Sequence, residues 1–457
     1  MITSNETRLA KHCISHAAAC GASAARIYLN KCVTDSYTIL NGELDKVAHS
    51  ADRSIYIYLY VDGRYGTFST NRLEEKELEE FVEKAIEMVR MLGEDECRRL
   101  PDPSRTAKDA ITGHELGLYD RSYESMDSDT RLSNAHKLSI YESIVNDNDE
   151  KPYRVISEEC EYSCTSDESY TVDSQGFEGK HCETAFGTFS EMTIQDKEGN
   201  RYSGYWWQAT PKADDTDFEN CSRKALQRAV DQIGPKKRRS GRYRMVVDTS
   251  VASRLISPIL TALNASSIQQ KMSFLEDSKG NRIFHEGMTL MDLARTPGKN
   301  GSRLFDTEGV ATKDAPIIEN GVVQQYFVNT YHSLKMGIEP TIEDISRPCL
   351  MPYIKGETLQ SGEKEVSLTD ILKLAGNGIL VSGFNGGNCN PVTGDFSFGI
   401  EGFAFSKGKI THPVREMLIT GNIVELWNSL LAAGSDARPS SRWQIPTLAF
   451  EGVAFSA

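Results

Sequence analysis

Apolar positions in the first 93 residues change from helical to strand spacing and back. They recur at helical intervals within the first 24 residues and again over Leu73–Leu92, which predicts an amphipathic helix at each place. Between these helices, strand-like runs are separated by turn signals such as Asn41-Gly42. The pattern predicts an α+β unit at residues 1–93, with three or four antiparallel strands between two helices. The strand-like runs are Ala25–Leu29, Ser36–Leu40, Leu44–Ala48, Ser54–Val61 and Tyr65–Ser69.

A second α+β unit is predicted over residues 114–234, after a polar linker with two prolines at residues 94–113. Its first helix is expected at Ser128–Val145. Strand-like runs begin at Tyr153, and the turn signals between them predict long hairpins. A helix over Thr216–Ile233 is expected to end the unit.

The pattern changes again in the C-terminal half. Over residues 235–457, glycines and turn signals recur roughly every 8–12 residues, which is typical of a β-rich barrel or sandwich. A strand is predicted at Tyr243–Asp248, an apolar helix at Ser250–Ala265, and a hairpin around the turn Lys407-Gly408-Lys409. The expected fold class is therefore α+β, with antiparallel sheets and flanking helices in the N-terminal part. The C-terminal domain is expected to be β-rich and barrel-like or sandwich-like.

The first arm of that hairpin contains Gly399 and Gly402 between alternating apolar residues. Glycine weakens a strand, and it occurs in strands where a bulge forms or another backbone comes close. Two interpretations follow: the hairpin lines a binding cleft, or its glycines allow close packing in a core. Under the first interpretation, the candidate peptide-binding residues lie at the turn before this arm. They are Asn390, Pro391, Thr393, Gly394, Asp395 and Phe396.

Composition limits the location and the partners. With 51 basic and 65 acidic residues the net charge is -14, so we expect no nucleic-acid partner. No apolar run approaches the roughly 18 residues of a membrane span, and the N-terminus lacks the apolar core of a secretory signal. We expect a cytoplasmic protein without a membrane partner, whose ten cysteines are free thiols. They are Cys13, Cys20, Cys32, Cys97, Cys160, Cys164, Cys182, Cys221, Cys349 and Cys389.

A zinc peptidase needs two histidines on one helix face and an acid beside the bound water, so the histidines of this chain are candidate metal ligands. His114-Glu115 and His285-Glu286 each begin such a motif, but the second histidine is missing. His12 and His16 are four residues apart on a predicted helix and have the spacing of metal ligands. No acid lies between them, so we interpret this pair as a coincidence of one helix face.

Four groups of short segments occur in a characteristic order. They are Asn41–Leu44 with Asp62–Thr67, Lys271–Leu275 with Gly301–Val310, Ile318–Gly321, and Asn390–Ser397. In this combination the chain, from about residue 20 to its end, resembles the PmbA/TldD family, specifically the PmbA (TldE) branch. Proteins of this family have carried the label "modulator of DNA gyrase". The resemblance implies an α/β N-terminal part and a β-rich, barrel-like C-terminal part.

The same resemblance has consequences for chemistry. The family includes cytoplasmic metallopeptidase complexes of a TldD and a TldE subunit, which cut unfolded or peptide-like substrates. The TldD branch carries HExxxH on a helix and a cysteine in a glycine-rich loop near the C-terminus. By order along the chain, these places correspond to Leu255–Ala262, with no His or Glu, and Asp436–Trp443, with no Cys. The resemblance therefore implies no cofactor in this chain, with zinc only in a TldD-type partner. The run Pro340–Asp344 also departs from the Pro-Thr-Gly-Asn run usual in the PmbA branch.

Three functional hypotheses agree with these sequence features. The first is a non-catalytic TldE-like subunit that pairs with a TldD-type subunit and holds an extended peptide by strand addition. The second is a stand-alone peptide-binding or regulatory homodimer, as the gyrase label suggests, although these residues give no sign of DNA contact. The third is a cysteine hydrolase that uses Cys389, with His412 as its base.

Overall fold

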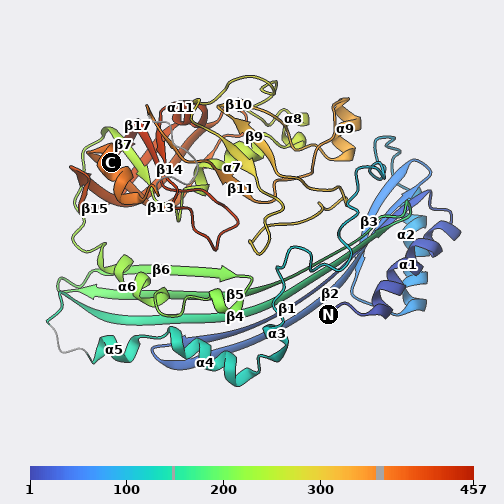
Figure 1. Cartoon of the computed structure of the whole chain (residues 1–457), viewed down its shortest axis with the longest axis horizontal. Coiled ribbons are helices and arrows are strands. Elements are labelled where there is room, and N and C mark those ends of the chain that lie inside the picture. Colours follow the sequence, from blue (N-terminus) through green and yellow to red (C-terminus); the bar gives the residue numbers. More distant parts are fainter. Residues whose placement is uncertain (147–149, 357–364) are drawn as a thin grey trace. The chain divides into compact units, whose positions relative to one another are not determined.

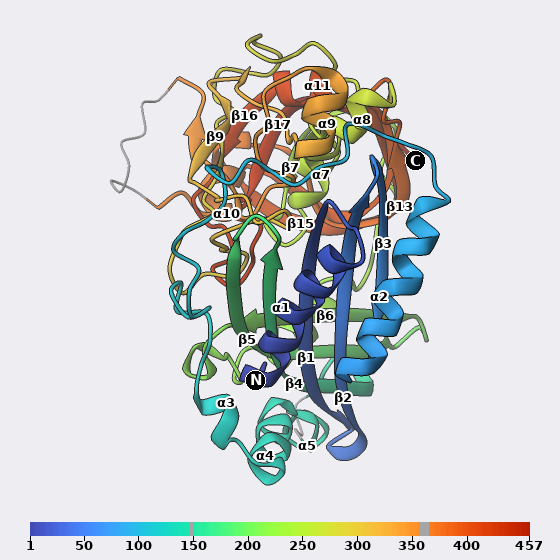
Figure 2. The ribbon, with the colours of Figure 1, turned by 90° about the vertical axis from the view of Figure 1, so that its right-hand side faces the viewer.

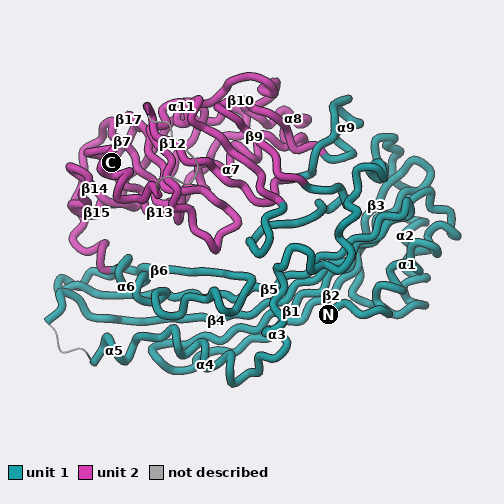
Figure 3. Tube along the Cα trace, in the orientation of Figure 1, with its two compact units in different colours: residues 1–229, 295–312, 329–343 teal, residues 230–294, 313–328, 344–457 magenta. Residues whose placement is uncertain are grey.

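The computed structural model describes residues 1–146, 150–356 and 365–457. The chain forms two compact units, and Figure 3 shows that two later segments belong to the same unit as the N-terminal half. Unit 1 comprises residues 1–229, 295–312 and 329–343, and unit 2 comprises residues 230–294, 313–328 and 344–457. The predicted α+β class is confirmed. The division into residues 1–93, 94–113, 114–234 and 235–457 stays a prediction.

A six-stranded antiparallel sheet forms the frame of unit 1, in the order β3-β2-β1-β4-β5-β6 (Figure 1). Its strands are longer than the sequence pattern predicted. The polar stretch between Ala25–Leu29 and Ser36–Leu40 continues the ladder, because Lys31 and Asp35 pair with both β2 and β4. The strands are β1 Ala24–Leu40, β2 Glu43–Val61, β3 Arg64–Thr70, β4 Tyr153–Asp173, β5 Glu178–Asp196 and β6 Arg201–Thr210.

Two helices, α1 (Ser4–Ala19) and α2 (Glu75–Arg90), cover the β1–β3 end of this sheet, as Figure 2 shows. Both were predicted from their apolar spacing. Thr3 begins α1 with a capping box, in which its side chain accepts from the Glu6 amide and the Glu6 carboxylate accepts from the Thr3 amide. The buried faces of the two helices share one core with the strands, and this core fixes the helices side by side.

The remaining helices of unit 1 are short. The single helix expected over Ser128–Val145 is two helices, because Ser139 has an extended backbone between them. The buried carboxylate of Glu158 accepts from the amides of Ile140 and Tyr141 and so caps the second helix; burial raises the pKa of this carboxyl group. These helices are α3 Ser122–Ser125, α4 Ser128–Leu138, α5 Tyr141–Val145, the 3-10 turn Ala213–Asp215, α6 Cys221–Val230 and α9 Thr330–Met336.

Unit 2 contains a β-barrel, which confirms the barrel-like alternative for the C-terminal part. Its sheet has the order β12-β16-β17-β15-β14-β13-β7, and an additional pairing of β17 with β7 closes it. The strands are β7 Gly241–Val247, β12 Tyr353–Ile354, β13 Gly378–Cys389, β14 Asp395–Ser406, β15 Lys409–Asn422, β16 Leu430–Ala433 and β17 Leu448–Ser456. A second, four-stranded sheet consists of β8 Leu290–Asp292, β9 Ala315–Glu319, β10 Val322–Val323 and β11 Pro348–Leu350.

The described residues of unit 2 form four helices. The apolar helix expected at Ser250–Ala265 is observed as two, because the Asn264 side chain accepts from the Ser266 amide and starts a new helix. The helices are α7 Ser253–Ala262, α8 Ala265–Gln269, α10 Leu368–Ala375 and α11 Ile423–Asn428. Across the described ranges, which omit residues 147–149 and 357–364, no helix has the length and apolar character needed to cross a bilayer.

The predicted hairpin is formed by β14 and β15, and β13 lies on the other side of β14. A Cβ atom on Gly402 would lie 1.9 Å from the Leu380 carbonyl oxygen, and one on Gly399 would lie 2.4 Å from that of Asn385. The ladder also shifts register beside both glycines. Close approach of a second backbone, together with bulges, therefore explains why glycine occupies these two positions.

Candidate functional site

A pocket of about 230 Å³ lies in unit 2, between α7 and the turn that joins β13 to β14. It brings together two stretches that the sequence singled out separately: the apolar helix and the turn before the glycine-rich strand. The lining residues are Arg254, Ser257, Pro258, Thr261, Ala262, Phe274, Asn388, Cys389, Pro391 and Phe398.

The apolar spacing of α7 determines which side of the helix faces the pocket. Its inner face is buried in unit 2, and the Trp427 indole Nε1 donates to the Leu255 carbonyl oxygen over 3.1 Å. Because the helix repeats every 3.6 residues, the polar side chains of Arg254, Ser257 and Thr261 lie on the opposite, exposed face. Together with Pro258 and Ala262, these three side chains form the helical wall of the pocket.

Arg254 provides the positive charge of the pocket. Its Nη2 donates to the Gly387 carbonyl oxygen over 3.0 Å, and its guanidinium lies over the Phe398 ring, 5.0 Å from the centroid. Phe398 is only 1% exposed, and it packs between Phe384 and Phe396 at centroid distances of 5.7 and 5.2 Å. The cation is thus held over an aromatic wall whose inner side belongs to the barrel core.

The six predicted binding residues all lie at the β13–β14 turn, but only Pro391 lines the pocket. The polar side chains build the turn itself. Asn390 Oδ1 accepts from the Val392 amide over 2.9 Å, and Asp395 accepts from the Thr393 hydroxyl over 2.7 Å. Asn422 Nδ2 donates to Asp395 Oδ1 over 3.0 Å. These two side-chain bonds to Asp395 lower the pKa of its carboxyl group.

The other two predicted residues support the pocket from behind. Gly394 has φ +77°, and a Cβ atom there would lie 3.2 Å from the Phe274 ring, so glycine keeps the turn tight against this pocket residue. Phe396 is buried and stacks on Phe398. A direct role of these six residues in binding peptide stays a prediction.

Cys389 lines the pocket, and its Sγ faces the Asn390 carbonyl oxygen at 3.7 Å. Burial and the nearby Asp395 carboxylate raise the pKa of this thiol. The predicted dyad with His412 is wrong. In the barrel sheet Cys389 pairs with Phe396, and His412 pairs with Ala404. Phe396 and Ala404 both lie on β14 and are eight residues apart, which corresponds to roughly 26 Å along the strand at about 3.3 Å per residue.

The donor atoms around the pocket do not fit a zinc site. Zinc in proteins is held by three or four thiolate, imidazole or carboxylate ligands. The lining offers one thiol, that of Cys389, together with the hydroxyls of Ser257 and Thr261, the amide of Asn388 and the guanidinium of Arg254. A fixed guanidinium repels a cation, and neutral hydroxyl and amide groups are poor replacements for the missing ligands.

Sequence reasoning did not identify Arg254, Phe274 or Asn388 as pocket residues. A signal existed for Phe274, which lies inside the segment Lys271–Leu275 that carries the family resemblance. Another existed for Arg254, which is a charged residue on the exposed face of α7. For Asn388 the local sequence held no such signal, because its position depends on the bulge that β13 forms against β14.

Comparison with known proteins covers nearly the whole chain. Three family models of the PmbA/TldA metallopeptidases match in order: domain 1 at residues 25–89, the central domain at residues 71–233 and the C-terminal domain at residues 240–457. The last of these contains α7, the β13–β14 turn and every residue that lines the pocket.

Curated relatives are similar over most of their length. The chain is 26% identical over 423 residues to the metalloprotease PmbA homolog of Haemophilus influenzae, which covers 91% of this chain and 88% of that protein. It is 24% identical over 430 residues to the metalloprotease PmbA of Escherichia coli O157:H7, which covers 92% and 89% of the two chains.

Solved structures extend this similarity to the fold. A protein of Bacteroides thetaiotaomicron, described as a modulator of DNA gyrase, has a TM-score of 0.92 and 39% identity, with both chains fully covered. TldE from Thermococcus kodakarensis has a TM-score of 0.79 and 18% identity, covering 98% of this chain and 100% of its own. The second comparison shows a shared fold alone.

Proposed function

The chain belongs to the PmbA/TldD family, and on this premise we propose that it is a TldE-like subunit of a TldD/TldE-type metallopeptidase complex. In this proposal it holds unfolded or modified peptides for a TldD-type partner and binds no zinc in its own pocket. The observation that carries the proposal is the pocket beside α7, which has an aromatic wall and a fixed arginine but not the ligands of a zinc ion.

Spacing on α7 supports the proposed loss of the zinc site. In an HExxxH helix the functional side chains occupy the first, second and sixth positions of the motif. Ser257, Pro258 and Ala262 have this spacing, and all three line the pocket. None of them offers an imidazole or a carboxylate, so the pocket keeps the helix of a peptidase without side chains that hold zinc or accept a proton from its water.

The remaining features suit an extended peptide. Phe274, Pro391 and Phe398 provide apolar surface for one side chain, and Arg254 can donate to a peptide carbonyl or carboxylate. β13 pairs with β7 only up to Val381. After this residue, among the described strands, only β14 pairs with β13. The exposed edge at Gly383–Asn385 can accept a peptide strand beside the pocket.

The proposal is tested with the pure full-length chain. We expect it to bind a fluorescein-labelled unfolded peptide that carries one phenylalanine, without cleaving it, and to contain less than stoichiometric zinc at the pocket. Co-expression with a TldD-type protein should give a complex that cleaves the same peptide. Cleavage by the chain alone, abolished by a chelator and by substitution of pocket residues, would overturn the proposal.

A pocket-filling variant tests where the peptide binds. Thr261 is exposed on the pocket face of α7, so Thr261→Trp fills the space without disturbing the core. We expect the peptide affinity to fall at least about tenfold, which is about 1.4 kcal/mol. The matched control is Leu374→Trp on the exposed face of α10, which should leave the affinity unchanged. Equal affinities for the two variants would place the peptide elsewhere.

A further inference from the structure

The seam between α1 and α2 carries a regular series of potential metal ligands in unit 1. On α1, or at its C-cap, His12, His16 and Cys20 follow one another at intervals of four residues, so they lie on one helix face. Acids with the same spacing face them from α2. These acids are Glu75, Glu79 and Glu83. The seam therefore combines nitrogen, sulfur and oxygen donors from two helices that a shared core holds together.

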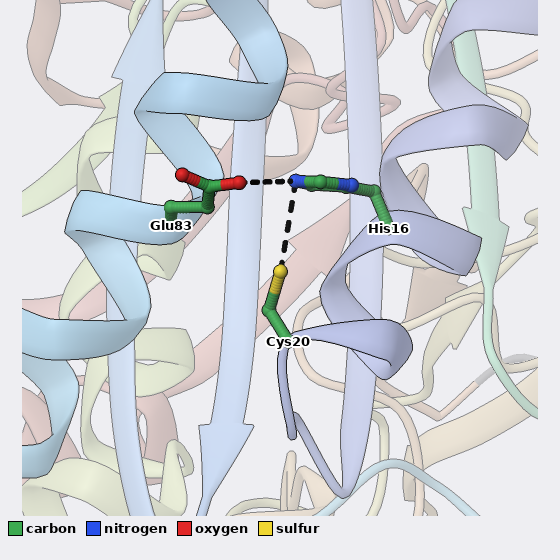
Figure 4. A group of neighbouring side chains, drawn as sticks. All are labelled: His16, Cys20 and Glu83. Atoms are coloured by element: carbon green, nitrogen blue, oxygen red, sulfur yellow. Dashed lines mark hydrogen bonds and ion pairs between the residues drawn. The ribbon is translucent and has the colours of Figure 1, made fainter.

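Three of these side chains converge on one point (Figure 4). His16 Nε2 lies 3.3 Å from Glu83 Oε1 and 3.6 Å from Cys20 Sγ, and all three donor atoms lie within 4.8 Å of one another. The same ring nitrogen faces both partners. A nucleophile–base–acid relay uses the two opposite nitrogens of the ring, so this geometry does not match a catalytic triad.

The distances match the edges of a metal coordination tetrahedron. With Zn–S of about 2.3 Å and Zn–N or Zn–O of about 2.0–2.1 Å, a sulfur and a nitrogen ligand stand about 3.6 Å apart, and a nitrogen and an oxygen ligand about 3.3–3.4 Å apart. The observed 3.6 Å between Cys20 Sγ and His16 Nε2 and the 3.3 Å between His16 Nε2 and Glu83 Oε1 agree with both values.

We propose that His16, Cys20 and Glu83 bind a Zn²⁺ ion and that the ion ties the end of α1 to α2. A thiolate and an imidazole favour zinc over Mg²⁺ or Ca²⁺, which prefer oxygen ligands. His16 is 18% exposed and Glu83 is 57% exposed, so an ion can enter from solvent and a water molecule can complete the tetrahedron.

The charges around the three ligands favour a cation. Glu79 and Glu83 lie on the same face of α2, one turn apart. A basic group, Arg90, lies close to Cys20: its Nη2 donates to the carbonyl oxygen of Cys20 over 3.3 Å, and its Nε lies 3.5 Å from Asp62 Oδ2. Asp62 pairs with the Arg90 guanidinium, and neither of these two Arg90 contacts involves the Cys20 sulfur.

The neighbouring turn of the seam provides an internal comparison. His12 Nε2 contacts Glu79 Oε1 at 2.8 Å and Glu75 Oε1 at 4.0 Å, but this cluster has no thiol. Glu75 also pairs with Arg8 at 2.9 Å, so a fixed cation already competes for one ligand. We therefore expect the ion at Cys20 and expect the pair formed by His12 and Glu79 to remain an ordinary surface ion pair.

The test is a titration of the metal-free, reduced full-length chain with Co²⁺ and then Zn²⁺. We expect one equivalent of Co²⁺ to give a thiolate-to-cobalt charge-transfer band and tetrahedral d–d bands, which Zn²⁺ removes by displacement. Cys20→Ser should abolish the charge-transfer band, and His16→Gln and Glu83→Gln should each weaken Zn²⁺ binding at least about tenfold. Zn²⁺ should also raise the unfolding temperature of the wild type more than that of Cys20→Ser.

Two matched variants complete the design. His12→Gln removes the histidine of the neighbouring cluster, and Cys389→Ser removes the half-buried thiol of the pocket. Both should keep the charge-transfer band and the Zn²⁺ affinity, and Mg²⁺ should not displace the Co²⁺. Saturation without a sulfur band, or an unchanged band in Cys20→Ser, would overturn the proposal. These readouts do not depend on peptide binding, so they succeed or fail separately from the proposed function.

Discussion

The pocket beside α7 and the seam between α1 and α2 differ in the metal-ligand atoms that each offers. In the proposed function the pocket's helix stands at the place of a peptidase motif, but the pocket lining has one thiol and a fixed guanidinium. The seam matches no peptidase motif, yet an imidazole, a thiol and a carboxylate converge there within 4.8 Å. A backbone scaffold and a ligand set are therefore independent properties, and metal chemistry has to be argued from the donor atoms.

The two regions also differ in how deeply they are built into the protein. The pocket wall is continuous with the barrel core, because Phe398 is almost fully buried. The seam is a surface feature in which every ligand is at least partly exposed. Four measurements test this contrast, in order of decreasing expected effect.

The largest effect is expected for Phe398→Ala. Removing a buried aromatic ring that packs against Phe384 and Phe396 should destabilise the protein by about 3–5 kcal/mol, through lost burial and a new cavity. Urea unfolding measures this as a shift of the midpoint at constant slope. On the same barrel, Ile410→Ala at a half-exposed position should change stability by less than about 0.5 kcal/mol. Similar losses in both variants would mean that the pocket wall is not part of the core.

The next effect separates the two thiols. With saturating Zn²⁺, alkylation of Cys20 should slow at least about tenfold, because a metal-bound thiolate is no longer a free nucleophile. Alkylation of Cys389 should be unchanged, since the pocket lining adds no imidazole, carboxylate or second thiol to this thiol. Peptide mass spectrometry after timed iodoacetamide treatment measures both rates in one sample. Equal protection of the two cysteines would remove the contrast between the regions.

A smaller effect is expected for Arg254→Gln. Losing the positive charge at the pocket should weaken binding of a labelled peptide about tenfold, the size of one charge-assisted hydrogen bond. Arg254→Lys should recover part of the loss, because it keeps the charge without the planar fork. The control is Arg244→Gln on β7, whose side chain pairs with Glu451 and does not line the pocket. Fluorescence anisotropy gives the three affinities, and a loss equal to that of the control would contradict the assignment.

The smallest effect concerns pH. Burial and Asp395 raise the pKa of the Cys389 thiol, so its thiolate fraction at neutral pH is lower than that of an ordinary cysteine. Its alkylation rate should therefore still be rising above pH 9. Asp395→Asn removes the nearby negative charge and lowers the pKa, so alkylation at pH 8 should become about two- to threefold faster. A rate that levels off below pH 9 in the wild type would contradict the direction of the shift.

Much of the fold could be predicted from the sequence, because the signals are local. The apolar spacing of α1 and α2 and the turn between β14 and β15 were sufficient for those elements. The continuity of β1 was not predictable in this way, since its polar middle around Lys31 is held by ladders on both sides. Barrel closure was also beyond local patterns, because it joins Val247 on β7 to Leu448 at the far end of the chain.

Local sequence patterns predict even less of the candidate sites than of the fold. The sequence identified the β13–β14 turn, but among its six predicted residues only Pro391 lines the pocket. The position of Arg254 over Phe398 depends on two elements that lie far apart in sequence. At the seam, the sequence has no acid between His12 and His16, because the acids that face them lie on a different helix. That information is present only when α2 packs against α1.

The outer half of β13 has a consequence for the size of what it can bind. From Gly383 to Asn385 its backbone is extended and pairs with β14 on one side only. The extended run ends at Gly386 and Gly387, which both have positive φ. A guest strand could keep its ladder for only about three residues, or roughly 10 Å, before the bulge ends the match. If a peptide adds to this edge as proposed, the edge pairs with an extended segment of only about three residues, which is too short to nucleate sheet growth between molecules.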